Sequence, residues 1–263
     1  MAIALYAHRG AAAELPENTL PAFRRAMERG ATAIETDAHV TKDGHVVLSH
    51  DATGARAAGA PHGIADSTLE QVRGWNVAHG QPGEFTIPTL EEALEDLPGV
   101  PFNVDCKPSG RDAAAALVRV VRGMGAQERV LIASFRSRTL RHVRRLGYEG
   151  KTSLGQGEIV RLALTPLSLL RALPLRGNAA QVPTRAFGVR FDTRRFVDKC
   201  HALGLVAHYW TIDDPLEARR LVDLGADGIM TNDPRLVAPA LGIPGAGAGS
   251  TPVAPTKKHG ARA

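Results

Sequence analysis

The segment that decides the fold spans residues 8–51 and reads HRGAAAELPENTLPAFRRAMERGATAIETDAHVTKDGHVVLSHD. His8 at its start and His50 near its end each close a short apolar run, as expected where a buried strand meets a loop. Between them, Glu35 and Asp37 stand two residues apart in a further apolar run. Because side chains alternate along a strand, both carboxylates are expected on one face of it. The segment therefore predicts buried strands that end in ionisable groups.

The acidic pair and the two histidines together indicate a metal-dependent acid–base site. Two carboxylates on one strand face repel each other unless a positive group lies between them, and a divalent cation bound by oxygen ligands is a common solution. Taken singly, a histidine at a strand end is more often structural, and an acidic pair is often neutralised by arginine. The combination of all four groups in one short segment favours the functional interpretation.

A recurring unit predicts the architecture of the whole chain. A segment with helical periodicity ends at a glycine and is followed by a short apolar run, as in residues 24–30 before 33–40 and residues 201–204 before 205–210. Glycine after a helix adopts the left-handed conformation that turns the chain back, and alternating helices and strands predict a parallel sheet. Strands are expected near residues 2–8, 33–39, 101–107, 129–134, 151–154, 179–183, 205–210 and 227–231, with 46–49 as an extra short strand. Eight such units predict an α/β protein that closes into a (β/α)8 TIM barrel, whose active sites lie at the carboxyl ends of the strands.

The order and spacing of these motifs resemble the glycerophosphodiester phosphodiesterase family. The matching runs are HRG at 8–10, PENT at 16–19, ETD at 35–37, TKDG at 41–44, HD at 50–51, NVDCK at 103–107, SF at 134–135, QVP at 181–183, YWT at 209–211 and GIMT at 228–231, followed by Asp233-Pro234. The resemblance covers about residues 3–240 and implies a TIM barrel with a small capping insertion, residues 52–88, after the second strand. We therefore expect one catalytic domain over residues 1–243 and a disordered tail rich in Gly, Pro and Lys over residues 244–263.

The resemblance also implies which residues hold the cation and the phosphate. Glu35 and Asp37 are the expected ligands, with Asp105 as the third, and the cation is expected to be Mg²⁺ or Ca²⁺. The family usually has glutamate at the position of Asp105, so the shorter side chain must reach the cation through a small backbone shift or through water. Arg9 and Lys107 are expected to face the phosphate of the substrate.

His8 and His50 are the expected catalytic pair, because a ring with a pKa of about 6.5 can accept or donate a proton near neutral pH. The sequence leaves open which of the two is the base, and whether the adjacent glycerol hydroxyl or water attacks the phosphorus first. Glu17 and Asn18 match the family's E-N-T signature and are expected to bind substrate, although Asn18 is equally explained as the start of a helix. Trp210, at the end of a strand, is expected to pack against the glycerol, although an aromatic residue there is as often part of the core.

Composition excludes several classes of partner. The 263-residue chain has a net charge of +5, and aromatic residues make up 5%, too few for the stacking platforms of nucleic-acid binding proteins. Cys106 and Cys200 cannot form a disulfide framework, and the first residues lack the basic and apolar regions of a signal peptide. Prolines and glycines interrupt the uncharged run 236–256, which argues against a membrane span. We therefore expect a cytoplasmic protein that acts on a small molecule, with no nucleic-acid partner and no integral membrane segment; its oligomeric state stays open.

These inferences predict a metal-dependent enzyme that hydrolyses glycerophosphodiesters to sn-glycerol 3-phosphate and an alcohol by histidine acid–base catalysis. Two alternatives stay open. One is a barrel that binds such ligands without turnover, because a weakened third ligand at Asp105 would leave the cation unbound. The other is a phosphodiesterase of the lysophospholipase D type, suggested by the leucine-rich residues 159–175, which are otherwise explained as a barrel helix broken by proline.

Overall fold

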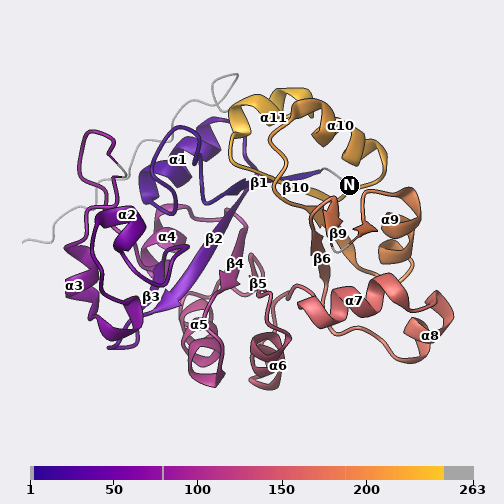
Figure 1. The fold of residues 1–263 in the computed structure, drawn as a ribbon, viewed down its shortest axis with the longest axis horizontal. Coiled ribbons are helices and arrows are strands. Elements are labelled where there is room, and N and C mark those ends of the chain that lie inside the picture. The colour runs from indigo at the N-terminus through magenta and orange to yellow at the C-terminus, as the bar shows by residue number, and fades with distance from the viewer. Residues whose placement is uncertain (1–2, 79, 187, 246–263) are drawn as a thin grey trace, which may run out of the picture.

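The computed structural model describes residues 3–78, 80–186 and 188–245 and has a curled parallel sheet at its centre, surrounded by helices (Figure 1). Within these ranges seven strands pair side by side in the order β5-β4-β2-β1-β10-β9-β6. Their bounds are β1 Ala4–His8, β2 Ala33–Val40, β4 Phe102–Cys106, β5 Val130–Ala133, β6 Ala179–Val182, β9 Val206–Tyr209 and β10 Gly228–Thr231. The short strand β3, Val46–Leu48, pairs antiparallel with β2.

A short eighth segment joins the two ends of this sheet and closes the barrel. Thr152 pairs with Ile132 of β5, and Ser153 pairs with Ala179 of β6, both in parallel. The backbone amide of Ser153 donates to the carbonyl oxygen of Ile132 over 3.0 Å. The predicted (β/α)8 TIM barrel is therefore confirmed, with the expected strand at 151–154 reduced to single bridges.

Helices alternate with the barrel strands and pack on the outside of the sheet. Their bounds are α1 Leu20–Glu28, α4 Leu90–Asp96, α5 Arg111–Gly123, α6 Ser137–Arg145, α7 Gln156–Leu164, α8 Leu167–Ala172, α9 Arg194–His201, α10 Pro215–Asp223 and α11 Pro234–Ala240. Thr19 begins α1 by accepting a hydrogen bond from the backbone amide of Ala22, and Thr89 begins α4 in a capping box with Glu92. After α1, Gly30 adopts a φ of 90°, which turns the chain back toward β2.

The apolar faces of the sheet and the helices form two large buried clusters. One contains Ile34 and Phe102 of β2 and β4 together with the inner faces of α4 to α6. The other contains Tyr209 and Ile229 of β9 and β10 together with residues of α7 to α11, such as Leu162. Because all five of these side chains are at most 1% exposed, the strands form a rigid frame that fixes the positions of their carboxyl ends.

The insertion between β3 and α4 folds as a small unit beside the barrel, on the left of Figure 1. Its elements are α2 Ala55–Ala58, a 3-10 turn Ile64–Asp66 and α3 Leu69–Arg73. They pack around Ile64, Val72 and Trp75 in a cluster of their own. The predicted insertion after the second strand is therefore present.

The leucine-rich segment forms two helices, because α7 ends before Pro166 and α8 begins after it. A short hairpin follows, with β7 at Arg185–Ala186 and β8 at Val189–Arg190. Every helix in the described part of the chain is too short or too polar to cross a bilayer. The predicted tail lies outside the described residues from residue 246 onward.

Candidate active site

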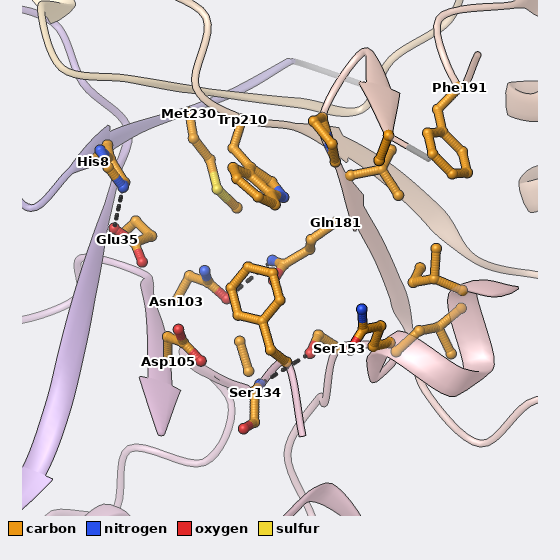
Figure 2. Close-up of a pocket in the computed structure, with 18 of the residues that line it drawn as sticks. His8, Glu35, Asn103, Asp105, Ser134, Ser153, Gln181, Phe191, Trp210 and Met230 are labelled. Carbon is orange, nitrogen blue, oxygen red and sulfur yellow. Dashed lines mark hydrogen bonds and ion pairs between the residues drawn. The ribbon is translucent and has the colours of Figure 1, made fainter. Parts of the chain in front are cut away.

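The register of the strands brings five of the expected site residues to one edge of the barrel. His8 ends β1 and pairs with Glu35 of β2, while Asp37, two residues further along, pairs with Asp105 of β4. Lys107 follows the end of β4. Because parallel strands end at the same edge, these side chains meet at the carboxyl end of the barrel. Figure 2 shows His8, Glu35 and Asp105 facing the same cavity.

Three carboxylates and two basic side chains form one largely buried charge cluster. The Nζ atom of Lys107 lies between two of the acids, 2.7 Å from Asp37 Oδ1 and 2.8 Å from Asp105 Oδ2. Arg9 Nε lies 3.1 Å from Asp37 Oδ2. Glu35 Oε2 accepts a long hydrogen bond, 3.3 Å, from the backbone amide of Arg9. The cluster thus sets three acidic groups against two basic ones.

Burial and mutual repulsion control the ionisation of this cluster. Burial raises the pKa of Glu35 well above its usual value, and the charges of Asp37 and Asp105 raise it further. Burial also raises the pKa of Asp105, against the attraction of Lys107. Burial opposes the ionisation of Asp37 too, but Lys107 and Arg9 outweigh it and lower its pKa. Among the three acids, Glu35 therefore depends most on an additional positive charge, such as a bound cation, to stay ionised.

The donor set fits a hard divalent cation in its chemistry. Glu35, Asp37 and Asp105 supply carboxylate oxygens, the ligands that Mg²⁺ and Ca²⁺ prefer. With the side chains as they stand, the described residues contain no group of three or more His, Cys, Asp or Glu side chains arranged around one metal position. The ammonium group of Lys107 occupies the space between two of the acids, Asp37 and Asp105. A cation held by the three acids therefore requires the Lys107 side chain to turn away from them.

A chain of hydrogen bonds from the loops after β9 and β10 fixes the tautomer of His8. Asp213 accepts from the backbone amide of Asn232 over 2.7 Å and from its side-chain Nδ2 over 2.8 Å. This leaves Asn232 Oδ1 facing His8 Nδ1 at 2.7 Å. Because an amide oxygen can only accept, Nδ1 carries the proton and Nε2, 3.9 Å from Glu35 Oε2, has a free lone pair. Burial lowers the pKa of His8, so the neutral ring prevails near pH 7.

His50 has charged partners instead. Its Nδ1 lies 2.8 Å from Asp51 Oδ1, and Asp51 also pairs with Arg56 of the insertion. Burial opposes the ionisation of Asp51, but Arg56 and His50 outweigh it and lower its pKa. The ionised carboxylate therefore accepts a hydrogen bond from Nδ1–H of His50. The two rings therefore differ in the partner of Nδ1, which is a carboxylate at His50 and a neutral amide at His8.

Glu17 and Asn18 hold other site residues and are not among the described residues that line the cavity. Glu17 Oε2 accepts from Arg9 Nη1 over 3.1 Å. Asn18 Nδ2 donates to Asp37 Oδ2 over 3.1 Å, from a backbone with a φ of 56° that asparagine tolerates. The N-cap of α1 is its neighbour Thr19. The geometry therefore gives Glu17 and Asn18 positioning contacts with Arg9 and Asp37.

The cavity above these residues has a volume of about 710 Å³ and two unlike ends. Its floor is polar, where Gln181 Nε2 donates to Asn103 Oδ1 over 3.0 Å. Trp210 lies on the wall, edge to face with Phe135, with ring centroids 5.5 Å apart at 86°. Figure 2 shows Trp210 between the polar end and Phe191, which lines the far, apolar end.

A second pocket, of about 830 Å³, adjoins the first. The two share His50 and Lys107 as lining residues. The exposed side chains of Lys42, Asp112 and Arg136 lie on the walls of the second pocket, and two alanines of the insertion complete it. A group bound between His50 and Lys107 would therefore have a pocket on each side.

Asn232 and Asp213 were not expected at the site from the sequence. The position of Asn232 follows from the closed barrel. β10 pairs with β1 and Thr231 lies beside Ala7, so the residues that follow them, Asn232 and His8, reach the same edge. Asp213 follows β9 in a loop, where no periodic pattern indicates the direction of a side chain.

Comparisons with known proteins agree over most of the chain. Residues 8–236 match the model of the Glycerophosphoryl diester phosphodiesterase family. A relative named glycerophosphodiester phosphodiesterase, from Caldanaerobacter subterraneus subsp. tengcongensis, is 32% identical over 87% of this chain and 93% of its own. One named probable glycerophosphodiester phosphodiesterase 2, from Mycobacterium tuberculosis, is 34% identical over 86% of each chain. A solved glycerophosphodiester phosphodiesterase from Parabacteroides distasonis superposes with a TM-score of 0.73 at 25% identity, over 91% of this chain and 97% of that one.

Proposed function

The chain belongs to the glycerophosphoryl diester phosphodiesterase family, and we propose that it hydrolyses glycerophosphodiesters to sn-glycerol 3-phosphate and an alcohol with the help of a divalent cation. One observation carries the proposal: a cluster of three carboxylates and two histidines with unlike partners line one cavity. Such a set can neutralise a phosphodiester, activate a nucleophile and protonate a leaving alkoxide.

The acidic cluster is the proposed site of the cation. Glu35, Asp37 and Asp105 would hold Mg²⁺ or Ca²⁺, which would neutralise the phosphate charge. Lys107, once turned away from the acids, would bind a phosphate oxygen. Arg9 is already held at the cavity by its ion pair with Asp37, so its charge is in place before the substrate arrives.

The histidines are the proposed base and acid. His8 Nε2, free and unprotonated, would accept the proton of the attacking hydroxyl, from water or from the glycerol hydroxyl beside the phosphate. His50, paired with Asp51, would donate a proton to the departing alcohol oxygen as the P–O bond breaks. If a cyclic phosphate forms first, the two rings exchange roles when water opens it. In either sequence, one water is added across one P–O bond.

A purified-protein assay tests this proposal. After removal of metals, the chain is given glycerophosphoglycerol, glycerophosphoethanolamine or glycerophosphocholine, with Mg²⁺, Ca²⁺ or excess chelator, and sn-glycerol 3-phosphate is measured with a coupled dehydrogenase. We expect product with a cation and none with chelator. Product formed in excess chelator would contradict the role of the cation, and binding without product under every condition would favour the non-catalytic barrel.

Substrate selectivity provides a second test. The second pocket is bordered by exposed side chains and places few constraints on a head group, so we expect kcat/KM for the three diesters to agree within roughly 200-fold. Bis(p-nitrophenyl) phosphate lacks the glycerol hydroxyls and should be a poor substrate, because polar groups of the site would be left unpaired. Equal cleavage of this ester and glycerophosphocholine would contradict glycerol recognition.

A further inference from the structure

The side of the barrel formed by α6, α7 and α8 carries an excess of positive charge (Figure 1). Residues 135–176 contain nine Lys or Arg and two Asp or Glu, which gives them a net charge of +7. The whole chain has a net charge of +5, so all the other residues together are at −2. The charge of the chain is therefore strongly asymmetric. We call the exposed side chains of residues 135–176 the α6–α8 face.

Both acids of the α6–α8 face are already neutralised by arginine. Glu158 Oε1 lies 2.9 Å from Arg144 Nη1, and Glu149 Oε1 lies 2.7 Å from Nη2 of Arg122 on α5. Neither acid therefore offsets the remaining positive charge. Six arginines that line neither pocket are exposed and have no ion-pair partner in the described part of the chain: Arg138, Arg141, Arg145, Arg161, Arg171 and Arg176.

The helices of this face are joined into one surface. The hydroxyl of Ser137, at the start of α6, accepts from the backbone amide of Gly157 in α7 over 3.2 Å. Arg138, Arg141 and Arg145 repeat at helical spacing on the side of α6 that faces away from its buried residues. The arginines of α6 therefore border the exposed side chains of α7 and α8.

The α6–α8 face also holds most of the exposed apolar side chains. Of the seven large apolar side chains that are exposed in the described ranges, five belong to it: Phe135, Val160, Leu164, Leu169 and Leu173. Leu164 is 72% exposed and Leu173 is 60% exposed. Single exposed apolar side chains are ordinary, but a group of them on one side of a protein marks a contact surface.

The charge of the face decides which partner can cover it. A second copy of the chain in a symmetric dimer would place the face against itself and bring the arginines of both copies together. The chain's own residues 244–263 contain three Lys or Arg and no acid, so they carry charge of the same sign. Nucleic acid would pair with the arginines but leave the leucines in water. Leucines flanked by arginines match the surface of an anionic bilayer, where both find partners.

We propose that the α6–α8 face docks the protein peripherally on the surface of an anionic phospholipid bilayer. Leu164, Leu169 and Leu173 insert among the lipid headgroups, and the surrounding arginines bind lipid phosphates. The inference goes beyond the proposed hydrolysis and does not depend on it.

Vesicle sedimentation tests the docking without any substrate. The purified full chain is mixed with vesicles of phosphatidylcholine alone, or of phosphatidylcholine and phosphatidylglycerol at 7:3, in 0.1 M NaCl. We expect the partition coefficient to be at least about tenfold higher with phosphatidylglycerol, and to fall at least about tenfold in 0.5 M NaCl. Equal binding to both kinds of vesicle, or binding to neither, would overturn the proposal, whether or not the protein hydrolyses a diester.

A matched pair of charge variants locates the contact. Arg141 on α6 and Arg219 on α10 are both exposed helical arginines, and α10 lies at the other end of the view in Figure 1. Arg141→Glu removes one attraction and adds one repulsion, each worth about fivefold, so binding to the anionic vesicles should fall roughly 25-fold. Arg219→Glu changes the net charge equally and should alter binding less than about twofold. Equal losses would overturn the proposal, because binding would then follow net charge alone.

A second pair tests the apolar contact. Leu173 and Leu216 of α10, which is 81% exposed, line neither pocket. Leu173→Asp should weaken binding on the order of tenfold, as expected when one leucine loses its apolar environment, whereas Leu216→Asp should change it less than about twofold. Equal losses in the two would overturn the proposal. Light scattering without vesicles completes the test, since a dimer that Leu173→Asp dissociates would assign the face to a second copy and overturn the proposal.

Discussion

The polar end of the cavity and its far, apolar end are built in different ways. The polar end takes its charged side chains from β1, β2 and β4 and the residues that directly follow them, and these charges are paired with one another. The apolar end takes its side chains from α7 and from the region of β8. The comparison teaches that the charged groups are held by rigid strand ends, whereas the far wall of the cavity is formed by a helix and a hairpin outside the sheet.

The largest expected effect is at the acidic cluster. Glu35→Gln and Asp37→Asn keep the shape of each side chain but remove its charge, so each should lower kcat/KM on the order of 10⁴-fold, as loss of several kcal/mol of charge stabilisation implies. The measurement is sn-glycerol 3-phosphate release at saturating Mg²⁺ or Ca²⁺. Glu91→Gln, at an acid on α4 that lines neither pocket, serves as the matched control. Wild-type activity in Glu35→Gln would exclude Glu35 as a ligand.

Next in size are the histidines. His8→Ala and His50→Ala should each lower the rate on the order of 10³-fold, with the double variant losing less than the product of the two. Activity of the wild type should rise with pH through the pKa of His8, which burial holds below its usual 6.5, because the base must be neutral. His8→Ala should lose this acidic limb of the pH profile. A profile unchanged by His8→Ala would remove that residue from the base role.

A smaller effect is expected where His8 meets its supporting loops. In Asp213→Asn, the new amide group and Nδ2 of Asn232 would both be donors and would face each other. Asn232 should therefore turn its Nδ2 toward His8 and impose the wrong tautomer on the ring. We expect a loss of activity on the order of 10²-fold. The exchanged pair Asp213→Asn with Asn232→Asp restores an acceptor beside His8 Nδ1 and should recover activity to within about tenfold of the wild type. Metal affinity should stay constant throughout. A double variant as slow as either single one would contradict the tautomer argument.

The smallest effect belongs to the third acid. Asp105→Glu should keep or improve the affinity for Mg²⁺ and Ca²⁺, whereas Asp105→Asn should weaken it by roughly tenfold, on the scale seen when groups around a metal site are altered. Isothermal titration with each cation measures this. Because Asp105 also holds Lys107, the Asn variant removes one of the two carboxylate partners of that side chain and leaves Asp37 as the other. Identical affinities in the two variants would mean that Asp105 is not a ligand.

The barrel and the residues at its strand ends could be predicted because they follow local rules. Glycines such as Gly30 end the helices, and alternation places Glu35 and Asp37 on one face, so the motifs had to meet at the carboxyl edge. The contact between Asn232 and Asp213 could not be predicted, because it joins two loops whose side-chain directions depend on the closed barrel.

Two further features depend on packing between distant segments. Lys107 was expected to face a phosphate, but it lies between two of the expected ligands, an arrangement set by a strand register that spans residues 37 and 105. The apolar end of the cavity could not be predicted either, because the stripe on α7 has the same periodicity as a stripe that packs into a core. Ile159 and Ala163 of this stripe do pack against the buried cluster that contains Leu162, whereas Val160 and Leu164 stay exposed.

The closure of the barrel at Thr152 and Ser153 has a consequence for the motions of the protein. Every other junction of the ring is a ladder of at least two consecutive pairs among the described strands, but here single pairs join the segment to β5 and to β6. The two large buried clusters lie on either side of the barrel, so each half can keep its own core while the pairs at this junction open. Two residues, Leu154 and Gly155, separate this junction from the start of α7 at Gln156. Local opening of this junction would therefore move α7, which lines the apolar end of the cavity, while the acids on β2 and β4 stay in place.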